Sequence, residues 1–157
     1  MKKRHMTLKI IWWGYVVLLF VFVVIKFTGS FTELASKITT TSFGENLNLM
    51  PFRTVSVQLA HFSEGWARFN IVGNTVPFIP LGFLMPMVYH KVNSFAKILV
   101  IGISSVLCIE LFQLFTRLGS FDVDDIMLNI MGILSGYFMV WFIKGLLKVK
   151  RLWKRST

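Results

Sequence analysis

Four long stretches of the chain consist mainly of apolar residues, with more polar segments between them. They cover about residues 8–27, 69–89, 96–115 and 123–146. A helix needs roughly 20 apolar residues to cross the hydrocarbon core of a membrane, and each stretch meets that length. The pattern therefore predicts an all-α fold, an integral membrane four-helix bundle that forms one domain over residues 1–157.

Polar side chains inside three of these stretches recur at helical spacing. Separations of three, four or seven residues place such side chains on one face of a helix. Ionisable groups inside a membrane are costly, so they are the first candidates for function. The three polar sets are Asn70 and Asn74; Glu110 and Gln113, followed by Arg117; and Asp122, Asp125 and Asn129.

The distribution of positive charge predicts the orientation of the chain in the membrane. Hydrophobic residues make up 55% of the sequence, and the net charge is +10. Most lysines and arginines lie at the N-terminus, in the second loop or at the C-terminus. Because cytoplasmic loops carry such an excess, both termini are expected in the cytoplasm and the first and third loops outside. The charge thus reflects membrane topology, and nucleic-acid binding is not expected.

This topology brings the three polar sets to one depth. The second and fourth spans begin outside and the third ends outside, so all three sets fall in the outer half of the membrane. Arg53 and Arg68, in the long outer loop, can reach the same region. Two interpretations stay open. One is a structural network of interhelical hydrogen bonds worth about 1 kcal/mol each, and the other is a site for a polar headgroup or small ligand.

The second stretch is expected to form a kinked helix. Pro77, Pro80 and Pro86 remove backbone donors and clash with the preceding turn. In lipid, the carbonyl groups that lose a partner must find another in the protein or in trapped water. This span is therefore predicted to pack inside the bundle.

The outer loop before it is predicted to contain an amphipathic helix. Val55, Leu59, Phe62 and Trp66 recur at separations of four, three and four residues. Such a helix lies on the outer surface or folds back onto the bundle. It either covers the bundle passively or acts as a lid over a site.

The start of the fourth stretch has both a structural and a functional interpretation. Asp122 or Asp124 suits the N-cap of a helix, where acidic groups also meet the positive end of the dipole. Asp125 lies deeper and fits capping less well. Further along the same face, Gly132 and Gly136 form a GxxxG motif, which lets another helix approach closely. This face is predicted to point into the bundle, and the motif also offers a contact for an oligomer.

The order and spacing of these motifs resemble the VanZ-like family of bacterial membrane proteins, over about residues 46–137. The resemblance implies a role in the cell envelope, in the bacterial cytoplasmic membrane, associated with resistance to teicoplanin-type glycopeptides. It implies no particular reaction. The motifs are Asn48-Leu49-Met50-Pro51-Phe52-Arg53, Asn70-Ile71-Val72-Gly73-Asn74, Phe78-Ile79-Pro80-Leu81-Gly82-Phe83, Glu110-Leu111-Phe112-Gln113, and Arg117-Leu118-Gly119-Ser120-Phe121-Asp122-Val123-Asp124-Asp125 with Asn129 and Gly132.

The first functional hypothesis is a binding protein rather than an enzyme. Its outward polar site would hold a phospholipid headgroup, a lipid-linked wall precursor or a lipoglycopeptide tail. Arginines pair bidentately with phosphate or carboxylate, and amides would hydrogen-bond the remainder. The candidate ligand-binding residues are Arg53, Asn70, Asn74, Glu110, Gln113, Arg117, Asp125 and Asn129.

Two alternatives use the same residues differently. An enzyme acting on a lipid-linked substrate would use Glu110 and Asp125 as a general acid and base. We expect no metal or cofactor, although Glu110, Asp122 and Asp125 offer the oxygen ligands that Mg²⁺ or Ca²⁺ prefers. A small lipid transporter or flippase is the third hypothesis, but no internal repeat of the kind found in transporters is evident.

Overall fold

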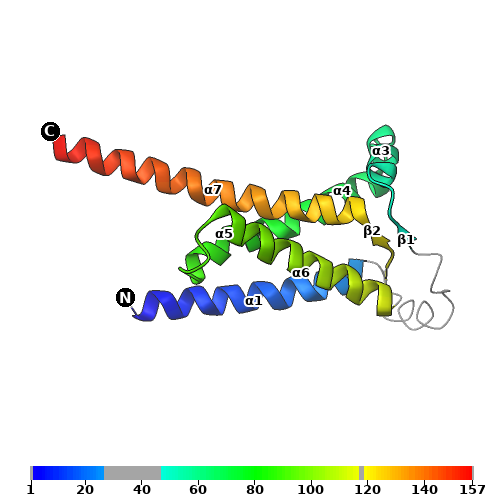
Figure 1. The fold of residues 1–157 in the computed structure, drawn as a ribbon, viewed down its shortest axis with the longest axis horizontal. Coiled ribbons are helices and arrows are strands. Elements are labelled where there is room, and N and C mark those ends of the chain that lie inside the picture. Colours follow the sequence, from blue (N-terminus) through cyan, green and yellow to red (C-terminus); the bar gives the residue numbers. More distant parts are fainter. Residues whose placement is uncertain (1, 27–46, 117–118, 157) are drawn as a thin grey trace.

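The computed structural model describes residues 2–26, 47–116 and 119–156, and these form a bundle of long helices (Figure 1). The helices that cross the bundle are α1 (Lys2–Lys26), α6 (Phe95–Thr116), α7 (Val123–Ser156) and a broken segment. That segment consists of α4 (Gly65–Thr75), the 3₁₀ turn η1 (Val76–Phe78) and α5 (Ile79–Val88). A short helix, α3 (Arg53–Ala60), precedes α4.

The predicted number and nature of the spans are confirmed. Among the described residues, four helical stretches are long and apolar enough to cross a membrane, namely His5–Val24, Gly65–Val88, Phe95–Thr116 and Val123–Lys148. The second span begins four residues before the predicted Phe69, because Gly65 starts a helix that runs into the apolar stretch. The fourth continues as helix α7 to Ser156, well beyond its apolar part.

The predicted kink in the second span is the 3₁₀ turn η1, which contains Pro77. Proline at this position cannot donate to the helical ladder. The hydroxyl of Tyr15 on α1 donates a 2.8 Å hydrogen bond to the carbonyl oxygen of Pro77. The Tyr15 hydroxyl therefore links α1 to the backbone at the kink.

Glycines on α7 let the kinked span approach it very closely. A Cβ atom added to Gly132 would lie 2.1 Å from the carbonyl oxygen of Thr75, and one added to Gly136 would lie 2.0 Å from that of Ile79. The GxxxG face therefore points into the bundle, as predicted. Its partner is the second span of the same chain, so an oligomer formed through this motif would have to displace that span.

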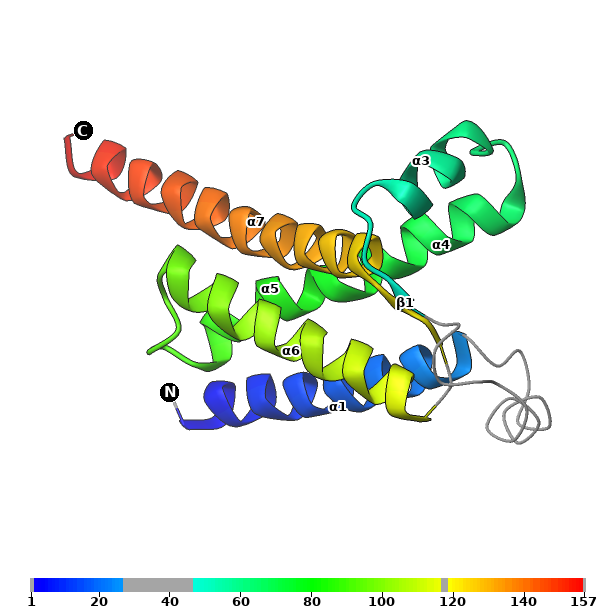
Figure 2. The same cartoon turned by 45° about the vertical axis from the view of Figure 1, so that its right-hand side comes forward.

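The segment over residues 47–64, which the sequence analysis assigns to the outer loop and which we call the outer segment, differs from the predicted helix. Helix α3 ends at Ala60, and a turn follows in which the amide of Glu64 donates to the carbonyl of His61. Phe62 therefore lies in the turn and Trp66 in the first turn of α4. The continuous spacing from Val55 is broken because Gly65 begins a new helix in a new direction (Figure 2).

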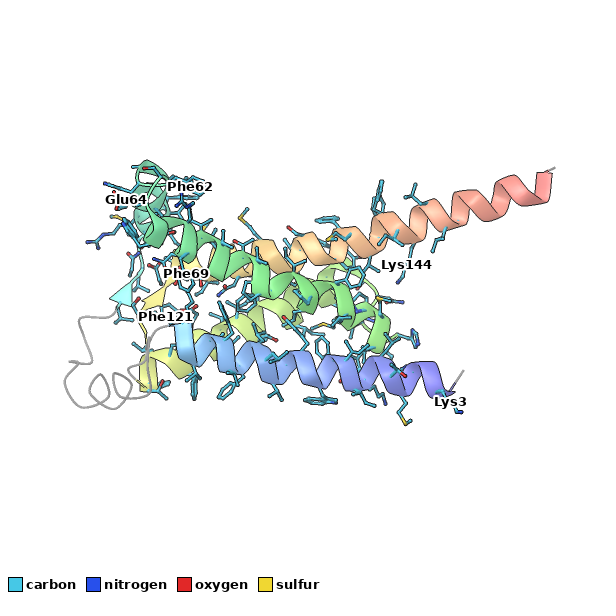
Figure 3. The ribbon with its side chains drawn as sticks, turned by 180° about the vertical axis from the view of Figure 1, so that it is seen from behind. Lys3, Phe62, Glu64, Phe69, Phe121 and Lys144 are labelled. Atoms are coloured by element: carbon cyan, nitrogen blue, oxygen red, sulfur yellow. The ribbon has the colours of Figure 1, made fainter. Side chains whose placement is uncertain are left out.

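A two-residue parallel pairing ties this outer segment to the start of α7. Strand β1 (Leu47–Asn48) pairs with β2 (Phe121–Asp122), with Leu47 opposite Phe121 and Asn48 opposite Asp122. Phe62 and Glu64 lie at this end of the molecule, whereas Lys3 and Lys144 lie at the opposite end (Figure 3). The two ends of the chain thus share one side of the bundle (Figure 1).

Candidate functional site

A buried chain of hydrogen bonds connects three spans at the end of the bundle near β1 and β2. The ammonium Nζ of Lys26, at the end of α1, donates to Oδ1 of Asn74 on α4. The Nδ2 of Asn74 in turn donates to Oδ1 of Asp125 on α7. Asn74 and Asp125 are both buried. The amide of Asn74 therefore links a cation and a carboxylate that come from different helices.

A second buried group adjoins this chain and comes from α6 and α7. The Nδ2 of Asn129 lies 3.4 Å from Oε1 of Glu110. Glu110, Gln113 and Asn129 are only 2%, 3% and 2% exposed. Asn129 lies one helical turn after Asp125 on α7, so the two groups adjoin. We call these six residues the polar cluster: Lys26, Asn74, Glu110, Gln113, Asp125 and Asn129.

Three oxygen atoms of the polar cluster lack a hydrogen-bond donor within the described part of the chain. They are Oε2 of Glu110, Oε1 of Gln113 and Oδ1 of Asn129. A buried acceptor without a donor costs about 1–3 kcal/mol. All three atoms are hydrogen-bond acceptors. The polar cluster can therefore bind a group that supplies hydrogen-bond donors, such as an ammonium or a hydroxyl.

The acidic residues just before this cluster have structural roles. Oδ1 of Asp122 accepts a 2.8 Å hydrogen bond from the backbone amide of Asp124, so Asp122 caps its own helix α7, which begins at Val123. Asp124 does not cap α7. Its Oδ1 accepts from the amide of Phe52 at 2.6 Å, and its Oδ2 accepts from those of Thr54 and Val55 at 2.8 and 3.0 Å.

Asp124 thus caps α3, a helix distant in sequence, and this corrects the prediction for that residue. Phe52, the N-cap position of α3, has a φ of 64°, which is unusual for a non-glycine residue. Asp122 adds a further link, since its Oδ2 accepts from the hydroxyl of Thr54 at 2.6 Å and its Oδ1 from Nδ2 of Asn48 at 3.1 Å. The two carboxylates hold the outer segment against α7.

The residues that form these contacts lie within the part of the chain that one family model matches. The VanZ/LLP1 family model covers residues 12–144. The chain belongs to the VanZ/LLP1 family. This match extends beyond residues 46–137 to take in the first span, and it includes all six members of the polar cluster. No curated protein and no solved structure shows significant similarity to the chain.

Five of the predicted site residues of this VanZ/LLP1 protein lie together in the polar cluster: Asn74, Glu110, Gln113, Asp125 and Asn129. Others lie apart from it. Asn70 is half-buried one turn before Asn74, and Arg53 is exposed at the start of α3. Arg117 lies outside the described residues.

Lys26 is the member that the sequence analysis missed. The sequence shows it only as one of the few basic residues assigned to the outer side. Its position directly after an uninterrupted apolar span was the available signal, because a lysine there is close to the depth of the three polar sets.

The candidate cation ligands of this VanZ/LLP1 protein have different hydrogen-bond partners. Glu110, Asp122 and Asp125 were the candidates for Mg²⁺ or Ca²⁺. Asp122 instead accepts hydrogen bonds from Asn48, Thr54 and the backbone of Asp124. Within the described ranges, no three His, Cys, Asp or Glu residues are grouped so that they would hold a metal ion.

Proposed function

We propose that this protein binds the polar headgroup of a membrane amphiphile at the outer face of the bacterial cytoplasmic membrane. The observation that carries the proposal is the set of buried acceptor oxygens without donors on Glu110, Gln113 and Asn129. Such groups are destabilising unless a ligand or water supplies donors. A headgroup that carries ammonium or hydroxyl groups would remove that cost, and this gain is available only when the ligand is bound.

Membership of the VanZ/LLP1 family supports a role in the envelope linked to glycopeptide resistance. On this proposal, the bound amphiphile is a phospholipid, a lipid-linked wall precursor or a lipoglycopeptide, and binding it reduces the damage that a teicoplanin-type antibiotic causes. The placement at the outer face rests on the charge asymmetry of the sequence, which assigns both termini to the cytoplasm. Arg53 and Arg117 are proposed to contact an anionic part of the same ligand.

Acid–base catalysis on a lipid-linked substrate is the second candidate function. Glu110 and Asp125 are two buried carboxyl groups, and Asn74 links Asp125 to Lys26. Two carboxyl groups in unequal surroundings are the arrangement that acid–base chemistry uses. An enzyme would change the mass of a lipid, whereas a binding protein would retain the lipid unchanged. Mass spectrometry of membrane lipids from cells with and without the protein separates the two.

To test the role in resistance, teicoplanin susceptibility is measured in a bacterial host that has no VanZ/LLP1 protein of its own. Wild type, Glu110→Gln and the matched control Glu64→Gln are expressed to equal levels in the membrane. Glu64 is exposed in the outer turn, away from the cluster. The expected result is that Glu110→Gln loses protection and Glu64→Gln keeps it. Equal protection by both variants would contradict a role for the cluster in resistance.

A further inference from the structure

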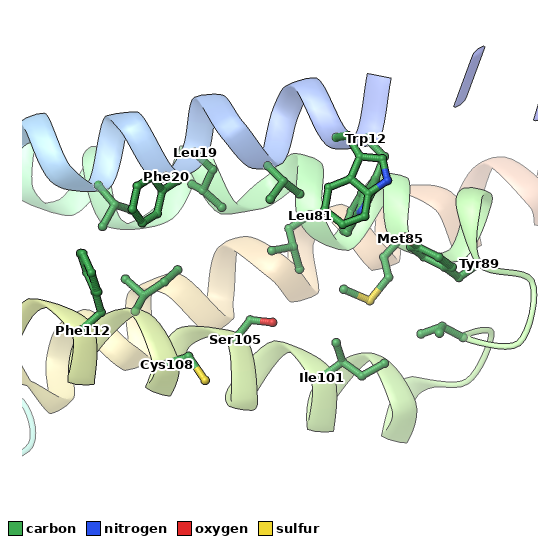
Figure 4. Close-up of a pocket in the computed structure, with 15 residues that line it drawn as sticks. Trp12, Leu19, Phe20, Leu81, Met85, Tyr89, Ile101, Ser105, Cys108 and Phe112 are labelled. Atoms are coloured by element: carbon green, nitrogen blue, oxygen red, sulfur yellow. The ribbon is translucent and has the colours of Figure 1, made fainter. Parts of the chain in front are cut away.

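A long apolar groove runs between α1 and α6, with α5 as its floor (Figure 4). It has a volume of about 650 Å³, and residues from Trp12 to Val23, from Leu81 to Tyr89 and from Ile101 to Phe112 line it. Cys108 and Phe20 are exposed at its rim. The groove therefore opens to the outer surface of the helix bundle, and within the spans that surface faces lipid.

The length of this α1–α6 groove corresponds to one leaflet of a membrane. From Trp12 to Val23 the rise along α1 is about 17 Å, at 1.5 Å per residue. Half of a hydrocarbon core is about 15 Å thick. The groove therefore has the length of a hydrocarbon chain that reaches the middle of the membrane.

The groove ends within about one helical turn of the polar cluster. Val23 lines the groove and precedes Lys26 by one helical turn. On α6, Ile109 and Phe112 line the groove, while Glu110 and Gln113, on the neighbouring face of the helix, belong to the cluster. The cluster residues do not line the groove themselves, but the buried polar atoms that lack donors lie near its end. An amphiphile with an apolar chain and a polar head requires such a neighbouring pair of sites.

The hydrogen-bonding groups of the polar cluster favour a particular headgroup. They include the acidic side chains of Glu110 and Asp125 and the side chain of Lys26, which donates to Asn74. The acceptors without donors on Glu110, Gln113 and Asn129 also need hydrogen-bond donors. An ammonium group supplies three donors and a positive charge. A headgroup that carries only acceptors would leave these atoms unsatisfied.

We propose that the α1–α6 groove holds one acyl chain of a membrane phospholipid whose ammonium headgroup binds at Glu110 and Gln113. This inference rests on the proposed headgroup function and specifies its ligand class. Because the groove opens within the spans, the lipid enters sideways from the bilayer. Ser105 lies midway along the groove on α6, so a large side chain there occupies the space of the acyl chain.

The chain-binding part is tested with a phosphatidylethanolamine probe that carries a photoactivatable group on its acyl chain. The full-length protein is reconstituted into phosphatidylglycerol vesicles that contain a trace of the probe, and cross-links are mapped by mass spectrometry. Ser105→Phe is compared with Ser104→Phe, because Ser104 is exposed on α6 and does not line the groove. Cys108→Trp is a second groove-filling variant, and circular dichroism verifies that each variant is folded.

Ser105→Phe and Cys108→Trp are expected to reduce labelling of the groove segments about tenfold, equivalent to a loss of 1.4 kcal/mol. Ser104→Phe should label like wild type. Equal labelling in Ser105→Phe and Ser104→Phe would overturn the groove as a chain site. Displacement of the probe by teicoplanin at lower concentration than by unlabelled phosphatidylethanolamine would assign the groove to the antibiotic tail and overturn the phospholipid assignment.

The headgroup part uses an otherwise identical probe with a glycerol headgroup. Wild type and Glu64→Gln should label more strongly with the ethanolamine probe, and Glu110→Gln should lose that preference. Equal labelling of wild type by both probes would overturn the ammonium assignment. If the groove variants label normally while Glu110→Gln still loses resistance, this inference fails and the proposed function stands. If Glu110→Gln changes neither labelling nor resistance, both fail.

Discussion

The side-chain amide of Asn74 donates a hydrogen bond to the carboxylate of Asp125, 51 positions further along the chain. The same amide accepts a hydrogen bond from Lys26. One side chain therefore joins the first, second and fourth spans. Because its partners are a cation and an anion in a buried setting, the loss of this amide leaves both charges without their shared neighbour.

We expect Asn74→Ala to destabilise the protein by about 1–3 kcal/mol for each buried polar group left without a partner. Thermal unfolding in detergent, compared with wild type, measures the effect. Asn93→Ala is the matched control, since Asn93 is exposed in the loop after α5. If both variants unfold at the same temperature as wild type, the hydrogen bonds of Asn74 do not stabilise the bundle.

The close approach of α7 to the second span predicts opposite effects for two glycine substitutions on one helix. A Cβ at position 136 would meet the Ile79 backbone at 2.0 Å, whereas one at position 145 meets nothing within 4 Å. Gly136→Ala should lower stability by about 1–3 kcal/mol through overpacking. Gly145→Ala should leave stability unchanged or raise it by about 0.5–1 kcal/mol. If the Gly136→Ala variant is as stable as wild type, the helices do not pack this closely.

The carboxylate of Asp124 is expected to control the order of α3. Removal of a side chain that accepts hydrogen bonds from the N-terminus of a helix costs about 0.5–2 kcal/mol. In Asp124→Ala, hydrogen exchange over residues 52–60 should accelerate while α6 exchanges as in wild type. Ser135→Ala, an exposed substitution on the same helix α7, is the control. Unchanged protection of α3 in Asp124→Ala would show that this cap does not hold the helix.

The hydroxyl of Tyr15 is predicted to stabilise the kink at Pro77. Tyr15→Phe removes the donor of the 2.8 Å hydrogen bond and keeps the ring. The expected loss is about 1–3 kcal/mol, because the Pro77 carbonyl is left without its donor from α1. Tyr89→Phe is the matched control at an exposed tyrosine. The comparison is made by thermal unfolding, and equal stability of the two variants would contradict this role.

Much of the architecture followed from local sequence patterns. Apolar run length predicted the spans, Pro77 predicted the break in the second span, and Gly132 with Gly136 predicted a close helix contact. These features depend on residues near one another in sequence, so helix geometry and backbone chemistry determine them. The alternating direction of the spans also placed Asn74 and Asp125 at one depth, where they form a hydrogen bond.

The remaining parts depend on contacts between distant segments. The role of Asp124 as the cap of α3 requires the outer segment to fold back beside α7, and no local pattern near Asp124 indicates this. The contribution of Lys26 requires α1 to end beside Asn74, which depends on how α1 packs along the second span. The α1–α6 groove depends on the separation of two helices, which apolar sequences alone do not determine.

The central claim is that the polar cluster binds a lipid headgroup, and the lipids that copurify with the protein test it most directly. Wild type, Glu110→Gln and Glu64→Gln are purified in mild detergent and analysed by native mass spectrometry. One lipid class should be retained by wild type and Glu64→Gln and depleted about tenfold in Glu110→Gln, because that variant replaces an acceptor oxygen of the cluster with an amide NH₂ group. An identical set of bound lipids in all three proteins would contradict the account.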